Sequence, residues 1–147
     1  MKTDLVVAGY IVHDNKVLLI HHKKLNMWLP PGGHIDKDET PDDAVIREIK
    51  EELNLDIDFM YKSDIPAEGD VKKVLVNPFH VNVHNAGDHD HCCFFYLCKP
   101  KNIESLAIVK SEVNDYQWFS SEELNQVSAG VRNSGQRALE LYSSLSE

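Results

Sequence analysis

The sequence is poor in cysteine, and its few cysteines form no recognisable framework. There are three, Cys92, Cys93 and Cys98, an odd number whose spacing matches no CxxC metal motif. We therefore expect no disulfide scaffold, and a chain of 147 residues is long enough to bury a core without one. The cysteines are expected to be buried strand residues of a reduced protein.

Long hydrophobic runs are also missing. No segment approaches the run of about 20 apolar residues that a membrane-spanning helix needs. The N-terminal stretch MKTDLVVAGYIVHD is interrupted by Gly9, alternates as a strand does, and is followed by no small-residue cleavage site, so we do not expect a signal peptide. These absences favour a cytoplasmic protein with no membrane partner.

Positive charge is scarce. Lysine and arginine together number 15 against 24 aspartates and glutamates, which gives a formal net charge of −9. Nucleic acids and anionic membranes attract proteins through basic surfaces, so neither is expected to be the main partner. An anionic small substrate remains compatible with this charge if cations mediate the contact.

Several segments of the chain have the apolar alternation and turn boundaries that are typical of strands. The expected strands are 5–13, 16–22, 55–62, 72–84, 89–98 and 115–119, and the expected helices are 41–53, a short one from 120, and 129–145. Strands and helices in this order predict an α/β fold, a mixed sheet between helical layers, as a single domain over residues 1–147.

Local signals fix the boundaries of the first elements. Asp14 and Asn15 tolerate the positive φ of a two-residue hairpin turn. The segment WLPPGGHIDKDET is expected to be a loop because of its proline and glycine content. Thr40 is expected to cap the helix that follows, with Pro41 at its first position, where a missing N–H costs nothing.

The helix expected at 41–53 has a crowded acidic face. Glu48, Glu51 and Glu52 fall within about one third of its circumference. The opposite, apolar side consists of Val45, Ile46, Ile49 and Leu53. Glu48 and Glu52 are four residues apart, so they are neighbours that repel and raise one another's pKa. Either the face is solvated, with an Arg47–Glu51 ion pair, or a cation neutralises it, and carboxylates are the ligands that Mg²⁺ prefers.

The segment GHIDKDETPDDAVIREIKEELNL, residues 33–55, resembles the Nudix box, G-x5-E-x7-R-E-U-x-E-E-x-G-U, in which U is aliphatic. The matching positions are Gly33, Glu39, Arg47, Glu48, Ile49, Glu51, Glu52 and Leu55. Asn54 departs from the box, which has glycine there. Asparagine is the next most tolerant residue at a left-handed helix C-cap, so we expect a positive φ at Asn54, with Leu55 turning back to the core.

The resemblance implies a mixed sheet sandwiched between helices and hydrolysis, with Mg²⁺ or Mn²⁺, of a nucleoside diphosphate linked to another moiety. Glu51 and Glu52 would be the main metal ligands, and Glu48 a further ligand or the general base. Arg47 would hold the carboxylates in place, because its planar guanidinium suits a bidentate contact with Glu39.

Two further metal ligands are expected outside the helix. The resemblance implies the backbone carbonyl of Gly32. A carboxylate outside the box often completes the site in the family, and Glu112, in the segment SEVND, is our candidate. Glu112 is otherwise a surface loop residue, and Asp115 and Glu68 are less favoured alternatives.

The stretch FHVNVHNAGDHDHCCFF is rich in histidine. A turn at residues 85–88 would pair residue 84 with 89, 82 with 91 and 80 with 93. Period-two alternation then places on one face His80, Asn82, His84, His89, His91 and Cys93.

Three interpretations of this hairpin compete: an exposed polar face, a substrate-pocket wall and a zinc site. Related Nudix sequences often carry an H-x-H pattern on the corresponding strand, here His89 and His91, which favours substrate binding by both. Those relatives often have aspartate where this chain has Cys93. The ligand types suit zinc, but the spacing matches no established motif. His22, at the end of the strand 16–22, is a third candidate for substrate binding.

Together these features predict a Nudix hydrolase that cleaves a phosphoanhydride bond of a nucleotide-type small molecule. Nudix hydrolases are often dimers, so a homodimer is compatible with the resemblance. The alternative is a catalytically silent nucleotide-binding or regulatory module of the same fold, which the three intact glutamates disfavour. The residues of the box do not determine which group is linked to the nucleoside diphosphate. We expect that group to be recognised by the histidine-rich hairpin and by residues 63–72.

Overall fold

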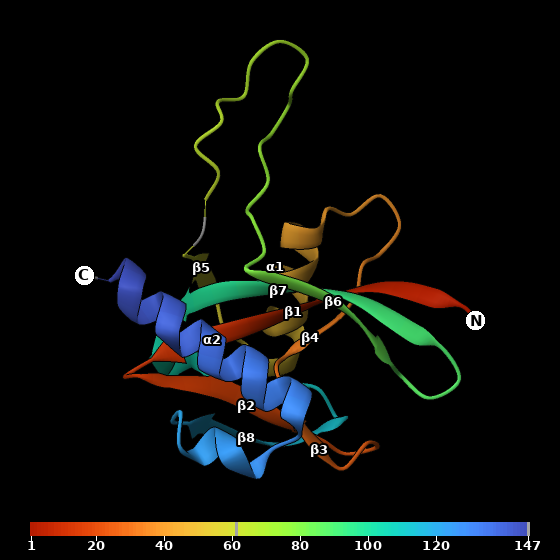
Figure 1. Ribbon diagram of the computed structural model, residues 1–147, viewed down its shortest axis with the longest axis vertical. Helices are drawn as coiled ribbons and strands as arrows, with labels where there is room; N and C mark the ends of the chain where they lie inside the picture. Colours follow the sequence, from red (N-terminus) through yellow and green to blue (C-terminus); the bar gives the residue numbers. More distant parts are fainter. Residues whose placement is uncertain (61, 147) are drawn as a thin grey trace.

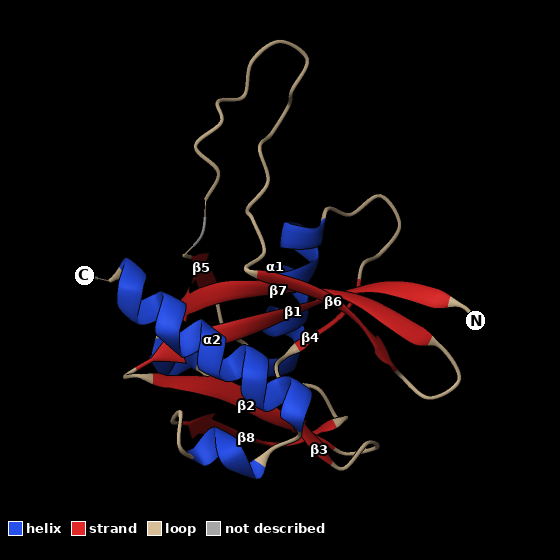
Figure 2. Cartoon of the chain, viewed as in Figure 1, coloured by secondary structure: helices blue, strands red, loops and turns tan. Residues whose placement is uncertain are grey.

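The computed structural model describes residues 1–60 and 62–146, and it has a mixed β-sheet with one long helix on each face (Figures 1 and 2). The strands are β1 (Thr3–His13), β2 (Lys16–His22), β3 (Met27–Leu29), β4 (Gly32–His34), β5 (Ile57–Phe59), β6 (His80–Asn85), β7 (Asp90–Pro100) and β8 (Val113–Phe119). The helices are α1 (Pro41–Leu53) and α2 (Ala129–Leu145), with short 3-10 turns η1 (Ile103–Ser105) and η2 (Glu123–Gln126). The predicted α/β class is confirmed.

The sheet is built around β1. Its main path runs β3–β2–β1–β7–β5, while β4 pairs with β1, β6 with β7 and β8 with β2. β1 and β7 run parallel, and the other pairs are antiparallel, so the sheet is mixed as expected. The parallel register sets Asp4 beside His91 and Val6 beside Cys93.

Alternation along β1 divides the core between the two faces of the sheet. Val6, Ala8 and Tyr10 pack with residues of α2, while Val7 and Ile11 pack with residues of α1. Figure 1 shows α2 lying across one face and α1 behind the other. The two helices thus cover opposite faces of β1, and successive side chains of β1 point alternately to one helix and the other.

Helix α1 begins and ends as its sequence predicts. The Thr40 side chain accepts a hydrogen bond from the Asp43 N–H at 3.4 Å, and Pro41 is the first helical residue. Asn54 caps the C-terminus with φ 53° and ψ 35°, the left-handed conformation expected for it. Leu55 is fully buried, so the chain does turn back into the core.

Three expectations about elements were wrong. The proline- and glycine-rich loop contains β3 and β4, which pair with β2 and β1. The strand expected over 72–84 begins only at His80, since its first half has no neighbouring strand partner in the described chain. The strand expected over 55–62 is limited to Ile57–Phe59, and residue 61 of that range lies outside the described residues.

The register of the histidine hairpin also differs from the expected one. His84 pairs with His91, Asn82 with Cys93 and His80 with Phe95, two residues further along β7 than expected. The turn therefore includes His89 instead of ending before it. Because the shift is an even number of residues, it preserves the face on which these side chains lie.

The apolar side of α1 is narrower than its sequence pattern indicated. Val45, Ile49 and Leu53 are fully buried, but Ile46 is 39% exposed. The polar side is correspondingly more buried, because Glu48 and Glu52 keep only 7% and 5% of their surface exposed. Two glutamates of the helix, Glu48 and Glu52, are therefore buried against the rest of the protein.

A long loop stands out from the sheet between β5 and β6. Residues 62–79 contain no helix or strand, and Figure 1 shows this segment projecting well beyond α1. Lys73 ties it to the first turn of α1, with its Nζ 3.5 Å from the buried carboxylate of Asp42 and 3.6 Å from that of Asp43. Within the described residues, no helix is both long and apolar enough to cross a lipid bilayer.

Candidate active site

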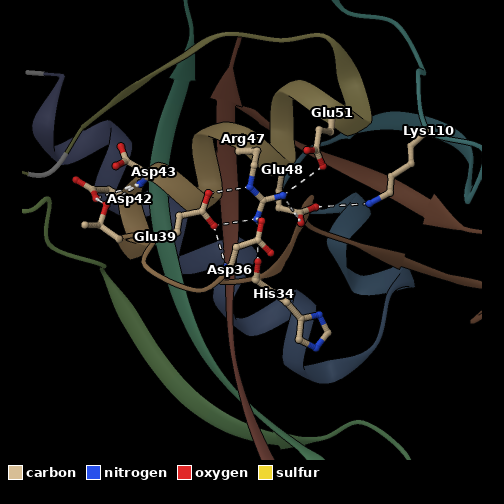
Figure 3. Close-up of polar contacts among 10 residues, drawn as sticks. His34, Asp36, Glu39, Asp42, Asp43, Arg47, Glu48, Glu51 and Lys110 are labelled. Carbon is tan, nitrogen blue, oxygen red and sulfur yellow. Dashed lines mark hydrogen bonds and ion pairs between the residues drawn. The ribbon is translucent and has the colours of Figure 1, made fainter.

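Arg47 is the centre of an ion-pair network on α1 (Figure 3). Its Nε and Nη2 atoms donate to the two carboxylate oxygens of Glu39 at 2.8 and 3.0 Å, which is the bidentate contact expected from the sequence. Its Nη1 donates to Glu48 at 3.0 Å and to Glu51 at 3.3 Å, and its Nη2 also reaches the carbonyl of His34 at 3.0 Å. One guanidinium thus joins the loop before the helix to two of the three glutamates.

The network perturbs both members of the Arg47–Glu39 pair. Hydrogen bonds from Arg47 lower the pKa of the Glu39 carboxyl, and the Glu39 contact raises the pKa of the Arg47 guanidinium. Glu39 also accepts the N–H of Asp36 at 3.0 Å. The pair is therefore ionised and held at both ends, so it can fix the side chains around it.

Glu48 and Glu52 lie inward of Arg47 against two glycines of β4. The N–H of Gly32 donates to Glu52 Oε1 at 2.9 Å. A Cβ at Gly33 would lie 2.5 Å from the Glu48 carboxylate, so only glycine leaves room for that group. Gly32 and Gly33 of β4 thus contact the two buried carboxylates, Glu52 and Glu48.

Glu52 has the most perturbed carboxyl group of the site. Burial, followed by the charge of Glu48, raises its pKa to about 8. Two carboxylates in this position favour a shared cation or a shared proton over two bare charges. A divalent ion fits this donor set, because carboxylate oxygens from one helix turn are the ligands that Mg²⁺ and Mn²⁺ take.

Lys110 is a member of the site that the sequence did not identify. Its Nζ lies 3.7 Å from Glu48 Oε2, on the side away from Arg47 (Figure 3). It belongs to the same loop as Glu112, whose side chain is exposed and has no hydrogen bond or ion pair to the box among the described residues. The loop of Glu112 therefore also brings a cation, Lys110, to the glutamates.

A cavity of about 460 Å³ adjoins these glycines on the α2 side of the sheet. Gly32 and Gly33 form part of its wall and also lie against Glu52 and Glu48, so the cavity and the two carboxylates share these residues. Most of its lining is apolar and comes from β1, β7, β3 and the start of α2. Of the three histidines expected to bind substrate, His22 and His91 line it and His89 does not.

Histidines gather at the rim of this cavity. His91 lies between His34, His84 and His89, with ring centroids 5.4, 5.5 and 4.9 Å away. Burial, and then these neighbouring imidazoles, lower the pKa of His91. His34, which the sequence left without a role, and Asp4 of β1 both join this group, and no local spacing could have indicated it.

Comparison with known proteins gives a consistent family. A model described as NUDIX domain matches residues 3–141. The structure is similar to a crystal structure of a NUDIX-family hydrolase from Clostridium perfringens, with 31% identity, 97% of this chain and 99% of that one covered, and a TM-score of 0.85. It also resembles in fold a MutT NUDIX hydrolase from Burkholderia pseudomallei, at 24% identity, 95% and 98% coverage and a TM-score of 0.71.

One curated relative is a protein named ADP-ribose pyrophosphatase, from Methanocaldococcus jannaschii. The two are 44% identical over 54 residues, which is 35% of this chain and 32% of the relative. The matched part is thus about a third of that protein's length. The family model covers nearly the whole chain, the fold agrees, and the glutamates of the box stand together on α1, so the chain belongs to the NUDIX family of hydrolases.

Proposed function

We propose that the protein hydrolyses a phosphoanhydride bond in a nucleoside diphosphate-linked substrate, with Mg²⁺ or Mn²⁺ bound by the box glutamates. The observation that carries this proposal is the pair of buried carboxylates, Glu48 and Glu52, seated on Gly32 and Gly33 at the wall of a 460 Å³ cavity. A diphosphate at this wall would need cations beyond Arg47 and Lys110 to offset the glutamate charges.

The metal ligands that we propose are Glu48, Glu51, Glu52 and the carbonyl of Gly32, with Glu112 as a further candidate. A divalent cation held there would neutralise phosphate charge and lower the pKa of a bound water. Because the pKa of Glu52 is raised by burial and by Glu48, this carboxylate favours the metal-bound or protonated form over a free anion.

The substrate is proposed to lie in the cavity, with its diphosphate toward β4. His22 and His91 are proposed to contact it from the wall, and His89 to act through its 3.1 Å contact with His91. A nucleoside diphosphate sugar is our first choice of substrate class, since a relative over 54 residues is named ADP-ribose pyrophosphatase. Pro30, Leu29 and Met27 offer an apolar wall on which a base or sugar ring could lie.

The test is a screen of nucleoside triphosphates, oxidised nucleotides, nucleotide sugars and ADP-ribose for phosphate or pyrophosphate release, with Mg²⁺ and with Mn²⁺. We expect metal-dependent turnover that Glu52→Gln reduces by orders of magnitude. The exposed Glu122 provides the matched control, because Glu122→Gln makes the same chemical change away from the cavity. Binding of a nucleotide without turnover would support the alternative, a silent binding module, and refute the hydrolase.

The role of Glu112 is tested in the same assay. If its carboxylate completes the metal site when substrate binds, Glu112→Gln should lower kcat and metal affinity together. Kinetics equal to those of Glu122→Gln would remove Glu112 from the site and leave the loop's contribution to Lys110.

A further inference from the structure

Four side chains, three from neighbouring strands and one from a turn, converge at the rim of the cavity, outside the carboxylate site. Asp4 lies on β1, His34 at the end of β4 and His91 on β7, while His89 comes from the turn just before β7. Each can offer one donor atom so that all four donors lie within 4.8 Å of one another. The parallel pairing of β1 and β7 sets Asp4 directly beside His91.

Three separations between these donor atoms are close to those of a tetrahedral metal site. Bonds of about 2.0–2.1 Å at tetrahedral angles place neighbouring donors about 3.3 Å apart. Asp4 Oδ2 lies 3.2 Å from His34 Nε2 and 3.6 Å from His89 Nε2, and His89 Nε2 lies 3.1 Å from His91 Nε2. Three of the six donor separations are therefore close to the tetrahedral spacing, and the other three are within 4.8 Å.

Two of the four side chains, His89 and Asp4, have their other polar atom engaged elsewhere. The Nδ1 of His89 lies 2.7 Å from the Asp88 carboxylate, which orients the ring and leaves Nε2 toward the cluster. Lys2 contacts Asp4 Oδ1 at 3.4 Å, so Oδ2 is the oxygen that faces the histidines. A carboxylate on the outer nitrogen of a ligating histidine is a usual support of metal sites.

The two metal sites would differ in chemistry. The box offers carboxylate oxygens, which suit Mg²⁺ and Mn²⁺, whereas three imidazoles and one carboxylate suit Zn²⁺ and its neighbours. We propose that Asp4, His34, His89 and His91 bind a transition-metal ion of the Zn²⁺ class, separate from the cation of the box glutamates.

This site goes beyond the proposed hydrolysis and does not depend on it. With the ion bound, His89 and His91 would be linked through it in place of their direct 3.1 Å contact. His34 connects the two centres, because its imidazole belongs to the cluster while its carbonyl accepts the 3.0 Å hydrogen bond from Arg47 Nη2. In Figure 3 the His34 ring points away from the carboxylates that surround Arg47. An ion on the cluster would therefore fix β4 at the point where the box begins.

The experiment is a Zn²⁺ titration of untagged, chelator-stripped full-length protein by calorimetry, in a large excess of Mg²⁺ that occupies the box. We expect one Zn²⁺ per chain, confirmed by elemental analysis after desalting. Co²⁺ in place of Zn²⁺ should give the intense visible absorption of a tetrahedral site. No substrate is present, so a failed hydrolase assay would not affect the outcome.

Variants locate the ion. His34→Ala and His89→Ala remove exposed and partly exposed ligands, so both should fold, as melting of the metal-free proteins can verify. Loss of an outer partner of a metal site lowers metal affinity by about 10–100-fold, which is the effect expected for Asp88→Asn. Each of the two histidine substitutions should lower the affinity for Zn²⁺ by more than that. His80→Ala, on the same hairpin face but outside the cluster, should bind as the wild type does.

The opposite results are equally clear. Zn²⁺ affinity unchanged in both His34→Ala and His89→Ala would overturn the site. Loss of the ion in Glu52→Gln with retention in His89→Ala would place it on the box instead. Absence of Zn²⁺ binding above the Mg²⁺ background would refute the proposal outright.

Discussion

Arg47 and Glu39 are joined by two parallel hydrogen bonds, of 2.8 and 3.0 Å, across the start of α1. Glu39 lies in the loop and Arg47 in the second turn of the helix, so the pair ties the loop to the helix that carries the glutamates. The same guanidinium contacts Glu48 and Glu51. Its role is therefore to position the metal ligands.

Replacing Arg47 by lysine should keep the charge and lose the geometry. A single ammonium cannot hold both oxygens of Glu39 and reach Glu48, so we expect kcat and Mg²⁺ affinity to fall together by about 10–100-fold, the usual cost of an outer-shell partner. Steady-state kinetics over a Mg²⁺ series would measure both. Arg137→Lys alters only an exposed pair with Glu140 on α2 and should change neither.

Asn54 makes a prediction about stability. Its φ of 53° is unfavourable for most residues, and its side chain also donates to the carbonyl of Ser105 at 3.2 Å. Asn54→Ala should therefore lower the free energy of unfolding by about 1–2 kcal/mol. Asn54→Gly should cost less, since glycine tolerates this conformation and loses only the contact to Ser105.

Urea unfolding would measure this difference. The control is Asn133→Ala, an exposed asparagine in the right-handed helix α2, where alanine should be neutral or slightly stabilising. If Asn54→Ala and Asn54→Gly were equally stable, the left-handed cap would not explain why asparagine substitutes for glycine in this box.

The parts of the structure that were predictable from sequence depend on local chemistry. The cap of α1 at Thr40, the hairpin turn at Asp14 and Asn15, and the angle at Asn54 are each determined within a few residues. The acidic face of α1 follows from helical periodicity in the same way. These features needed no knowledge of the distant chain.

The parts that were missed depend on pairing between distant segments. β3 and β4 have three residues each and exist because β2 and β1 lie beside them. Lys110 reaches Glu48 from a loop more than fifty residues away, and Asp4 meets His91 only through the parallel β1–β7 register. Spacing within one segment cannot reveal such contacts.

The two glycines of β4, Gly32 and Gly33, should respond differently to alanine. At Gly32 a Cβ would lie 2.1 Å from the carbonyl oxygen of Val7, a backbone atom that cannot move away, so Gly32→Ala should disrupt β4 and lower stability strongly. At Gly33 the obstructing group is the Glu48 carboxylate, which can rotate. Gly33→Ala should therefore fold but lose Mg²⁺ affinity and kcat.

Thermal melts and Mg²⁺ titrations of both variants would separate these effects. Gly130→Ala is the control for the melts alone, because a Cβ there meets nothing within 4 Å and replaces glycine in a helix, although Gly130 lines the cavity. Full activity of Gly33→Ala would contradict the close seating of Glu48 on β4.

Glu52 predicts how stability depends on pH in the absence of metal. Burial and Glu48 raise its pKa in the folded protein to about 8, from an ordinary value of 4.5. The folded state therefore holds this proton more tightly than the unfolded state does. The stabilisation is complete below pH 4.5 and is lost as the pH rises through 8, by up to about 1.4 kcal/mol per pH unit.

Urea unfolding in chelator between pH 5 and 9 would measure this loss, and comparison with Glu52→Gln would isolate it from other titrating groups. The glutamine variant cannot ionise, so its stability should fall less steeply and exceed that of the wild type at pH 9. Saturating Mg²⁺ should restore the wild type there and leave Glu52→Gln nearly unchanged, because only the carboxylate gains a cation. Glu122→Gln, an exposed change, should follow the wild type throughout. If the free energy of unfolding of the wild type and of Glu52→Gln changed with pH in parallel in chelator, ionisation of Glu52 would not destabilise the folded protein. The buried pair of carboxylates would then need no cation.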